Sequence, residues 1–184
     1  MTMVLQILEI TALAILLVLL VVYAIYQSVP RRIGFIPLPK RAVKSVIEAL
    51  AISDTVTLTM VDLGCGDGRI LAAALNQHLK LKGLGVEINP LVAWLARWRL
   101  HNLRDRVHIV RGDLFKTDFT KTTRVFTYLN PELMADLEPL LARGLKKGSR
   151  LVACDFRLPT RKPTDIIKIG ETWQLGQNLY VYEY

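Results

Sequence analysis

Hydrophobic residues form one uninterrupted block near the start of the chain and recur at regular intervals through the rest of it. From Ile10 to Pro30 the sequence runs for 21 residues without a charged side chain, and the eight residues before Glu9 are uncharged as well. As a helix, this 21-residue run is ~31 Å long, about the thickness of the hydrocarbon core of a bilayer. Apolar side chains occupy every face of that helix, which is typical of a membrane-spanning segment rather than of a helix lying on a surface.

A cleaved signal peptide and a buried core helix are the two alternatives for this block. A signal peptide has a positively charged region before the apolar run and a small-residue cleavage site after it, whereas this chain has MTMVLQILE and VPRRIG at those places. A core helix of a soluble domain is rarely so long or so uniformly apolar. We therefore predict an N-terminal transmembrane anchor in residues 1–30.

Basic residues lie on one side of the predicted anchor only. No Lys or Arg precedes it, and a basic juxtamembrane cluster follows it closely, formed by Arg31, Arg32, Lys40, Arg41 and Lys44. Because positive charge is retained on the cytoplasmic side of membranes, we expect a single-pass protein with its N-terminus outside and the rest of the chain on the cytoplasmic, or matrix-equivalent, side. The same cluster is expected to hold the following domain close to anionic lipid.

Strand-like and helix-like segments alternate through the remainder of the chain. The segments rich in β-branched and apolar residues predict strands over residues 57–64, 83–88, 107–113, 124–130, 150–156, 165–170 and 178–184, and helical spacing predicts helices over 40–52, 69–80, 90–103 and 131–146. This alternation predicts a Rossmann-like α/β fold with a seven-strand sheet and helices on both faces. The last two strands have no helix between them, so we expect a C-terminal antiparallel hairpin at one edge.

This pattern divides the chain into three parts. Residues 1–30 are the predicted anchor, residues 31–56 a basic juxtamembrane linker with a pre-domain helix, and residues 57–184 the domain itself. In such a sheet the ligand site is expected at the carboxyl ends of the strands, near a reversal of strand order.

Separating the anchor from the domain changes what the composition means. The 184 residues are 52% hydrophobic, which excludes a disordered chain, and carry a formal net charge of +8. Residues 1–30 contain one acid and no Lys or Arg, so the remaining 154 residues hold 24 bases and 15 acids, a net charge of +9. Such charge is typical of proteins that bind nucleic acid, anionic lipid or an acidic protein. The predicted anchor favours the membrane surface, and RNA stays as an alternative.

Cysteine and histidine residues do not form a recognisable metal site. Cys65 and Cys154 have no CxxC spacing, and His78, His101 and His108 are not paired as in HExxH. We therefore expect no metal ion and two reduced cysteines.

The segment DLGCGDGR, residues 62–69, lies between the first strand and its helix. Its alternating glycines allow a sharp turn and close approach of a ligand to the backbone. Glu87 ends the second strand, where a carboxylate can accept hydrogen bonds from ribose hydroxyls, and Asp113 follows the third. The alternative is a dinucleotide site with the pattern GxGxxG, but here the third glycine comes one position early and Arg69 occupies its expected place.

At these residues the sequence resembles the class I, seven-strand S-adenosylmethionine-dependent methyltransferases, over about residues 34–184. The resemblance implies that residues 57–184 are a methyltransferase domain and that S-adenosyl-L-methionine is the cofactor. The cofactor-binding residues that it implies are Asp62, Gly64, Gly66 and Gly68 in the glycine loop, Glu87 at the ribose, and Asp113 with Leu114 at the adenine.

Three further segments resemble a smaller, membrane-anchored group of these enzymes. GFIPLPKRAV before the first strand, YLNPELM after the fourth and ACDFRLP after the fifth are similar to the bacterial and mitochondrial proteins related to the ATP synthase c-subunit lysine N-methyltransferase. The chain departs from that pattern at Asn130, where an apolar residue is expected before Pro131. The resemblance implies a lysine side chain of a membrane-associated protein as the methyl acceptor.

Asn130 is the candidate catalytic residue on the acceptor side, where its amide would position an incoming amine. A turn residue before the next helix is the alternative role. The segment NPEL lacks the aromatic residue of the NPPY and NPPF motifs, which argues against a flipped base as substrate. Trp94 and Trp98 are expected to pack in the core or at the sheet edge rather than to stack on bases. The function predicted is membrane-anchored protein-lysine N-methylation; the alternatives are methylation of RNA, of a small molecule or of a lipid, and a non-catalytic cofactor-binding scaffold.

Overall fold

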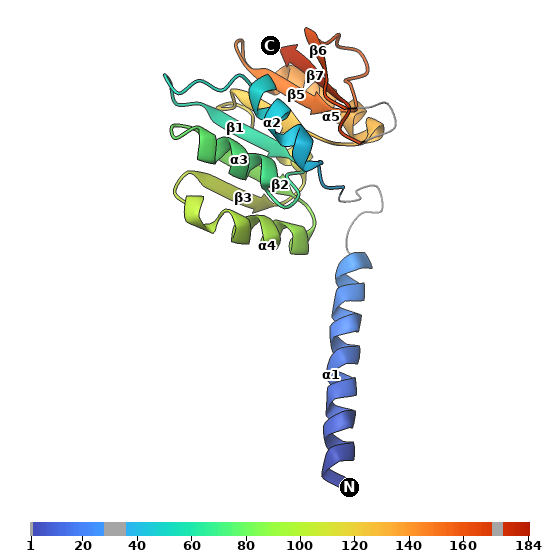
Figure 1. Cartoon of the computed structure of the whole chain (residues 1–184). Helices are drawn as coiled ribbons and strands as arrows, with labels where there is room; N and C mark the ends of the chain where they lie inside the picture. The colour runs from blue at the N-terminus through green and yellow to red at the C-terminus, as the bar shows by residue number, and fades with distance from the viewer. Residues whose placement is uncertain (1, 28–35, 171–174) are drawn as a thin grey trace. The chain divides into compact units, whose positions relative to one another are not determined.

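The computed structural model describes residues 2–27, 36–170 and 175–184 of the chain (Figure 1). The chain divides into two compact units, residues 1–35 and 36–184. Arg31 and Arg32 of the expected juxtamembrane cluster lie outside the described residues.

Helix α1 (Thr2–Gln27) is the described part of the first unit. Its segment Met3–Tyr23 has a mean hydropathy of 2.7, and none of it is buried in the structure. Glu9 is the one charged side chain in that segment. Length and composition therefore make α1 a candidate membrane span.

The second unit contains one seven-stranded sheet, which confirms the predicted Rossmann-like fold. The strands are β1 (Thr59–Leu63), β2 (Lys82–Glu87), β3 (Val107–Arg111), β4 (Arg124–Thr127), β5 (Arg150–Cys154), β6 (Asp165–Lys168) and β7 (Asn178–Glu183). Their order in the sheet is β3-β2-β1-β4-β5-β7-β6. Strands β1 to β5 pair in parallel, whereas β7 lies antiparallel to both β5 and β6, as the missing helix predicts.

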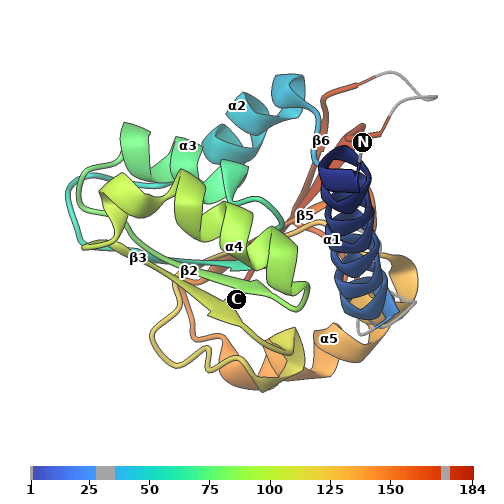
Figure 2. The same cartoon turned by 90° about the horizontal axis from the view of Figure 1, so that it is seen from below.

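Helices cover both faces of this sheet (Figure 2). They are α2 (Lys40–Ala49), α3 (Arg69–Gln77), α4 (Pro90–Arg99) and α5 (Pro131–Gly144), with 3₁₀ turns at His101–Leu103 and Leu114–Lys116. Helices α2, α3 and α4 lie on one face and α5 on the other. Helix α5 continues through Pro139 without a break.

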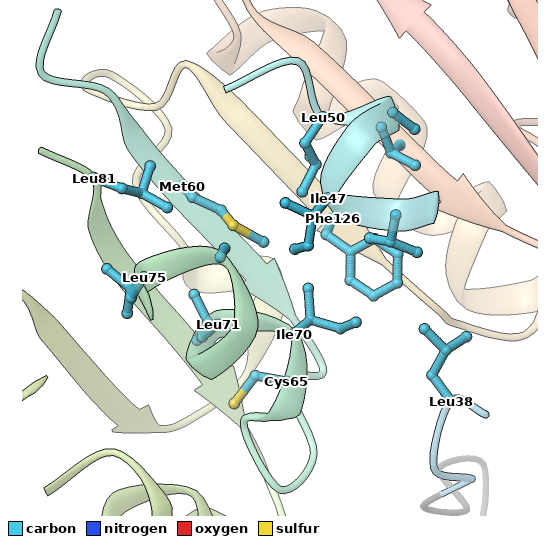
Figure 3. Packing of buried hydrophobic residues seen from close by; sticks show 14 of the residues in the cluster. Leu38, Ile47, Leu50, Met60, Cys65, Ile70, Leu71, Leu75, Leu81 and Phe126 are labelled. Atoms are coloured by element: carbon cyan, nitrogen blue, oxygen red, sulfur yellow. The ribbon is translucent and has the colours of Figure 1, made fainter. Parts of the chain in front are cut away.

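The main core lies between the sheet and helices α2 and α3 (Figure 3). Leu50, Leu71 and Met60 are fully buried there, and Phe126 of β4 is 3% exposed. Each fully buried side chain of this size contributes about 1.5–3 kcal/mol of hydrophobic stabilisation. This core holds β1 rigidly, and β1 is the strand from which the chain turns into the glycine loop.

Helix α4 packs on the sheet through its small residues. Ala93 and Ala96 are fully buried, whereas Trp94 and Trp98 are 59% and 67% exposed. Neither tryptophan packs in the core, so that part of the expectation is wrong; α4 lies beside the edge strand β3. The reason is the glycine loop: a Cβ added to Gly68 would lie 3.3 Å from the Cβ of Ala96, so α4 approaches too closely for a large side chain on this side.

Candidate functional site

The glycine loop connects β1 to α3 at the carboxyl edge of the sheet. Gly64, Gly66 and Gly68 have φ angles of +73°, +56° and +74°, the left-handed region in which a side chain is strained. The N–H groups of Gly64 and Cys65 both donate to the carbonyl of Val86 on β2, at 2.9 and 3.0 Å. The loop therefore lies against the end of β2, and β1 has β2 on one side and β4 on the other.

Glu87, the last residue of β2, holds the middle of this loop. Its Oε2 accepts a hydrogen bond from the N–H of Gly66 at 3.0 Å, and its Oε1 accepts one from the N–H of Asn89 at 2.8 Å. The side chain is 6% exposed. A carboxylate has about four acceptor positions, so two remain for hydroxyl groups of a ligand.

Asp113 lies next to Glu87 in space, because β3 and β2 are neighbours and the N–H of Gly112 donates to the Glu87 carbonyl at 3.0 Å. The Asp113 Oδ1 accepts from the N–H of Phe115 at 3.0 Å and so caps the short helix that begins at Leu114. Leu114 is buried. Asp113 and Leu114 thus offer a carboxylate and an apolar side chain next to each other at the end of β3. Such a pair suits a nucleobase, because the carboxylate can accept from an exocyclic amine and the apolar side chain can contact the ring.

Three carboxyl groups, those of Asp62, Asp67 and Glu87, lie close enough at the loop to affect one another. Asp62 is 2% exposed. Its burial and the nearby carboxylates of Glu87 and Asp67 disfavour the ionised form of its side chain. These causes, burial first, raise the pKa of Asp62 to about 8. A cation bound nearby would favour the ionised form of Asp62 and lower this pKa.

Two arginines fix the acidic residue inside the glycine loop. The Asp67 Oδ2 accepts from Arg69 and from Arg99 of α4, each at 2.8 Å. Burial alone would raise the pKa of Asp67, but the hydrogen bonds and charge of Arg69, with the charge of Arg99, outweigh it and hold that pKa below its usual value. Arg69 also donates to the carbonyl of Leu38 at 2.7 Å, which ties the segment before α2 to the loop.

Asn130 lies at the carboxyl end of β4 and begins helix α5. Its Oδ1 accepts from the N–H of Leu133 at 2.9 Å, the interaction of a helix N-cap. Asn130 therefore has the role of a residue that begins the next helix, which was the alternative considered from the sequence. Its contact with a methyl acceptor stays a prediction. The neighbouring Leu129 lies against the loop, because a Cβ added to Gly64 would come within 2.9 Å of its Cδ2.

Three residues at the ends of the strands beside Asn130 were not identified from the sequence: Tyr128, Asp155 and Phe156. The rings of Tyr128 and Phe156 stack with centroids 6.5 Å apart and planes 18° apart. Burial, and then the charge of Asp155 with a hydrogen bond to it, raise the pKa of the Tyr128 hydroxyl. A signal was present in the sequence, since all three directly follow the carboxyl ends of the adjacent strands β4 and β5.

Asp155 has an unusual backbone for a residue with a side chain. Its φ is +59°, and its carboxylate accepts from the N–H groups of Gly176, Gln177 and Asn178 at 2.7, 2.7 and 3.2 Å. Backbone strain of this kind persists where surrounding contacts stabilise it, and it is concentrated at functional sites. Asp155 therefore fixes the start of β7 against the end of β5, beside the aromatic pair.

The predicted cofactor residues are brought together at one edge of the sheet, with the acceptor-side residues next to them. Within the described parts of the chain, no three His, Cys, Asp or Glu side chains are grouped to bind a metal ion. Cys65 and Cys154 are buried, free thiols.

Comparison with known protein sequences identifies a family and several relatives. The family model described as ANTKMT methyltransferase domain matches residues 62–165. A protein-lysine N-methyltransferase of Saccharolobus islandicus (strain REY15A) is 31% identical over 152 residues, which are 82% of this chain and 92% of the relative. An ATP synthase c-subunit lysine N-methyltransferase of Xenopus laevis is 32% identical over 77% of this chain, and an adenine nucleotide translocase lysine N-methyltransferase of Mus musculus is 33% identical over 79%. This chain spans 63% of the length of each of these two animal proteins.

Comparison with solved structures gives the same fold. A structure described as an RNA methyltransferase from Salinibacter ruber, in complex with S-adenosyl-L-homocysteine, has a TM-score of 0.72 and 31% identity, covering 80% of this chain and 93% of that chain. A methyltransferase from Geobacter sulfurreducens, in complex with the same ligand, has a TM-score of 0.56 and 22% identity, covering 76% and 58% of the two chains. The second likeness shows the fold alone.

Proposed function

This chain belongs to the ANTKMT methyltransferase domain family and is an S-adenosylmethionine-dependent methyltransferase, and on that premise we propose that it methylates a lysine side chain of a membrane-associated protein. The observation that carries the proposal is the contact between the two halves of the site. Leu129 lies between Tyr128 and Asn130 and is packed against Gly64, so the acceptor-side residues adjoin the cofactor loop. Relatives named as lysine methyltransferases are similar to this chain in sequence.

The residues at the edge fit S-adenosylmethionine. Glu87 retains acceptor positions for the two ribose hydroxyls, Asp113 and Leu114 suit the adenine, and the buried acid Asp62 suits a cationic molecule. When bound, the cofactor supplies an electrophilic methyl group on a positively charged sulfur. The chain's part in an in-line transfer is to hold donor and acceptor in position.

A lysine acceptor has to lose its proton before it can attack. From an unperturbed pKa of about 10.4 this costs about 4.6 kcal/mol at pH 7. A partly desolvated site beside a sulfonium cation disfavours the ammonium form and reduces that cost. In this proposal the stacked rings of Tyr128 and Phe156 would contact the aliphatic part of the lysine, and the Tyr128 hydroxyl and the Asn130 amide would orient the amine.

We also propose that α1 anchors the enzyme in a membrane. Its apolar run is long enough to cross the hydrocarbon core, and all its described side chains from Met3 to Tyr23 are exposed. The basic residues that follow it favour the cytoplasmic or matrix-equivalent side for the rest of the chain. Extraction of membranes with alkaline carbonate tests the anchor, since a spanning protein stays in the pellet; protease protection of tags on the two termini tests the orientation.

RNA is the second candidate acceptor. The residues beyond the anchor carry a net charge of +9, and the solved structure of the Salinibacter protein is described as an RNA methyltransferase. Neither observation identifies a base-binding pocket, and the segment NPEL lacks the aromatic residue that would stack on a flipped base.

One labelling experiment separates these acceptors. Full-length enzyme is incubated with S-adenosylmethionine carrying a tritiated methyl group and with membranes and RNA from cells that lack its gene. Label in a protein band, recovered as methyllysine after acid hydrolysis, supports the proposal. Label confined to RNA or to the organic extract contradicts it.

Two variants make the assay specific for the proposed site. Glu87→Gln removes the charge of the proposed ribose-binding acid and is expected to abolish most of the labelling. Glu48→Gln is the matched control, because Glu48 lies on α2 and its side chain is 61% exposed in a surface pair with Lys44.

A further inference from the structure

Helix α4 carries an exposed apolar face, formed by Leu91, Trp94, Leu95 and Trp98. These residues recur at i, i+3, i+4 and i+7 and are 46%, 59%, 41% and 67% exposed. No other described helix of residues 36–184 has an exposed large hydrophobic residue. Exposed apolar surface concentrated in this way is typical of an interaction site.

Helix α4 lies beside the edge strand β3, the outermost strand on this side of the sheet. The guanidinium of Arg97 donates to the Ile109 carbonyl at 3.1 and 3.2 Å and so bridges the helix and the strand. The α4 face is therefore bordered by an arginine at the edge of the sheet.

The segment that contains α4 is predominantly basic. Residues 90–111 contain five arginines and a single acid, Asp105, a net charge of +4, and α4 itself contains no acid. Tryptophan is enriched where proteins meet the boundary between lipid headgroups and acyl chains, because its ring is apolar and its N–H is polar. A helix with an apolar face and basic residues beside it binds in the plane of an anionic bilayer.

We propose that the α4 face docks on the surface of a bilayer containing anionic lipid. This goes beyond the proposed methylation and rests, for proximity, on the proposed anchor. Eight residues, 28–35, separate α1 from the first described residue of the second unit, a chain length that reaches about 30 Å at most. A domain tethered so closely meets the bilayer surface at high local concentration. A second copy of the chain is a poorer occupant, because a symmetric contact would bring Arg97 of both copies together.

Docking of α4 would act close to the cofactor site. The helix begins at Pro90, and the preceding Asn89 donates its N–H to Glu87 and caps the helix by accepting from Leu91 and Val92. Asn89 therefore connects the surface proposed to contact lipid with Glu87, the proposed ribose-binding residue. The bilayer would place the catalytic edge of the sheet within reach of a membrane-embedded protein.

Tryptophan fluorescence tests this contact without interference from the anchor. The chain has three tryptophans, Trp94, Trp98 and Trp173, and α1 contains none. Full-length protein carrying Trp173→Phe is reconstituted into vesicles of phosphatidylcholine and phosphatidylglycerol whose acyl chains are brominated near the headgroup or near the chain end. We expect about a two-fold or greater loss of emission with bromine near the headgroup, and less with bromine near the chain end.

Two double variants distinguish the α4 face from exposed apolar residues elsewhere. Leu91→Ser with Leu95→Ser retains both reporter tryptophans and is expected to lose most of the quenching. Val56→Ser with Leu79→Ser is the matched control, because those side chains are exposed away from α4, and it is expected to be quenched like the parent. Replacing phosphatidylglycerol by phosphatidylcholine is expected to reduce quenching about two-fold.

Emission unaffected by bromine in every vesicle overturns the proposal. Quenching by added RNA instead of brominated lipid overturns it in favour of nucleic acid, and crosslinking of Leu95→Cys between copies overturns it in favour of a dimer. Alkaline extraction of the same vesicles reports the anchor independently, and the tritium assay reports methylation, so failure of the α4 contact is distinguishable from failure of either.

Discussion

Glu87 and Gly66, 21 residues apart in sequence, are joined by a hydrogen bond of 3.0 Å from the glycine N–H to the carboxylate. This bond fixes the middle of the glycine loop on the end of β2. The residue proposed to bind the ribose therefore also holds the loop that is proposed to receive the cofactor. Removing its charge is expected to affect cofactor binding more than the stability of the fold, because the core lies elsewhere.

Glu87→Gln is expected to raise the dissociation constant for S-adenosylmethionine about ten- to hundredfold. Hydrogen bonds to a charged group contribute about 1.5–3 kcal/mol, and each 1.4 kcal/mol is a factor of ten. Calorimetry of the full-length protein in detergent measures the constant, with Glu48→Gln as the matched control. An unchanged constant would exclude Glu87 from the ribose site.

Asp62 is expected to make stability depend on pH. Its pKa is raised from 3.8 to about 8 by burial, Glu87 and Asp67, so between these values the folded state binds a proton that the unfolded state does not. The contribution is fully present below pH 3.8 and is lost as pH rises through about 8, with a limiting slope of about 1.4 kcal/mol per pH unit.

Asp62→Asn removes this titrating group and should flatten the profile. The free energy of unfolding of the variant, measured in detergent from pH 5 to pH 8, is expected to fall less steeply than that of the parent. The difference between the two proteins should grow in favour of the variant as pH rises. Parallel profiles would show that Asp62 keeps an ordinary pKa in the fold.

Gly68→Ala is expected to destabilise the protein more than Gly148→Ala. Both glycines have left-handed backbone, with φ of +74° and +88°, and a side chain there costs about 1–2 kcal/mol. A Cβ at Gly148 meets nothing within 4 Å, whereas at Gly68 it lies 2.9 Å from the buried Leu100. Overpacking adds about 1–3 kcal/mol at Gly68. Equal losses in the two thermal unfolding curves would contradict the close approach of α4 to the loop.

Asp155→Gly separates backbone strain from side-chain contacts. Glycine relieves the positive φ of Asp155, worth about 1–3 kcal/mol, but removes a carboxylate that accepts three backbone N–H groups. Since hydrogen bonds to a charged group contribute about 1.5–3 kcal/mol each, we expect a net loss of stability, with Asp155→Asn intermediate. A variant that unfolds at a higher temperature than the parent would show that strain outweighs the contacts.

Much of the fold follows from local patterns in the sequence. The β-branched runs predict all seven strands, and the missing helix before the last strand predicts the antiparallel pairing of β7. The glycine loop and Glu87 are also visible as a motif, because a left-handed turn and an acid at a strand end need particular residue types. These features depend on neighbours along the chain.

The contacts of α4 and Asp155 could not be predicted in the same way. Helix α4 is apolar on several faces, so periodicity alone does not indicate whether Trp94 or Ala96 faces the sheet. The helix face that packs on the domain is determined by Gly68, which is 28 residues away from Ala96 in sequence. At this position helix and loop approach each other so closely that only a small side chain fits. Asp155 likewise depends on residues 176–178, which are brought to it by the pairing of β7 with β5.

The hydrogen bond from Arg69 to the Leu38 carbonyl has a mechanical consequence. Leu38 is among the first described residues after the segment that leads from α1, and Arg69 directly follows the glycine loop and holds Asp67. If α1 anchors the enzyme as proposed, a pull on the segment before α2 would act on the same guanidinium that holds Asp67 in the glycine loop. The proposed anchor and the proposed cofactor site would then share one arginine.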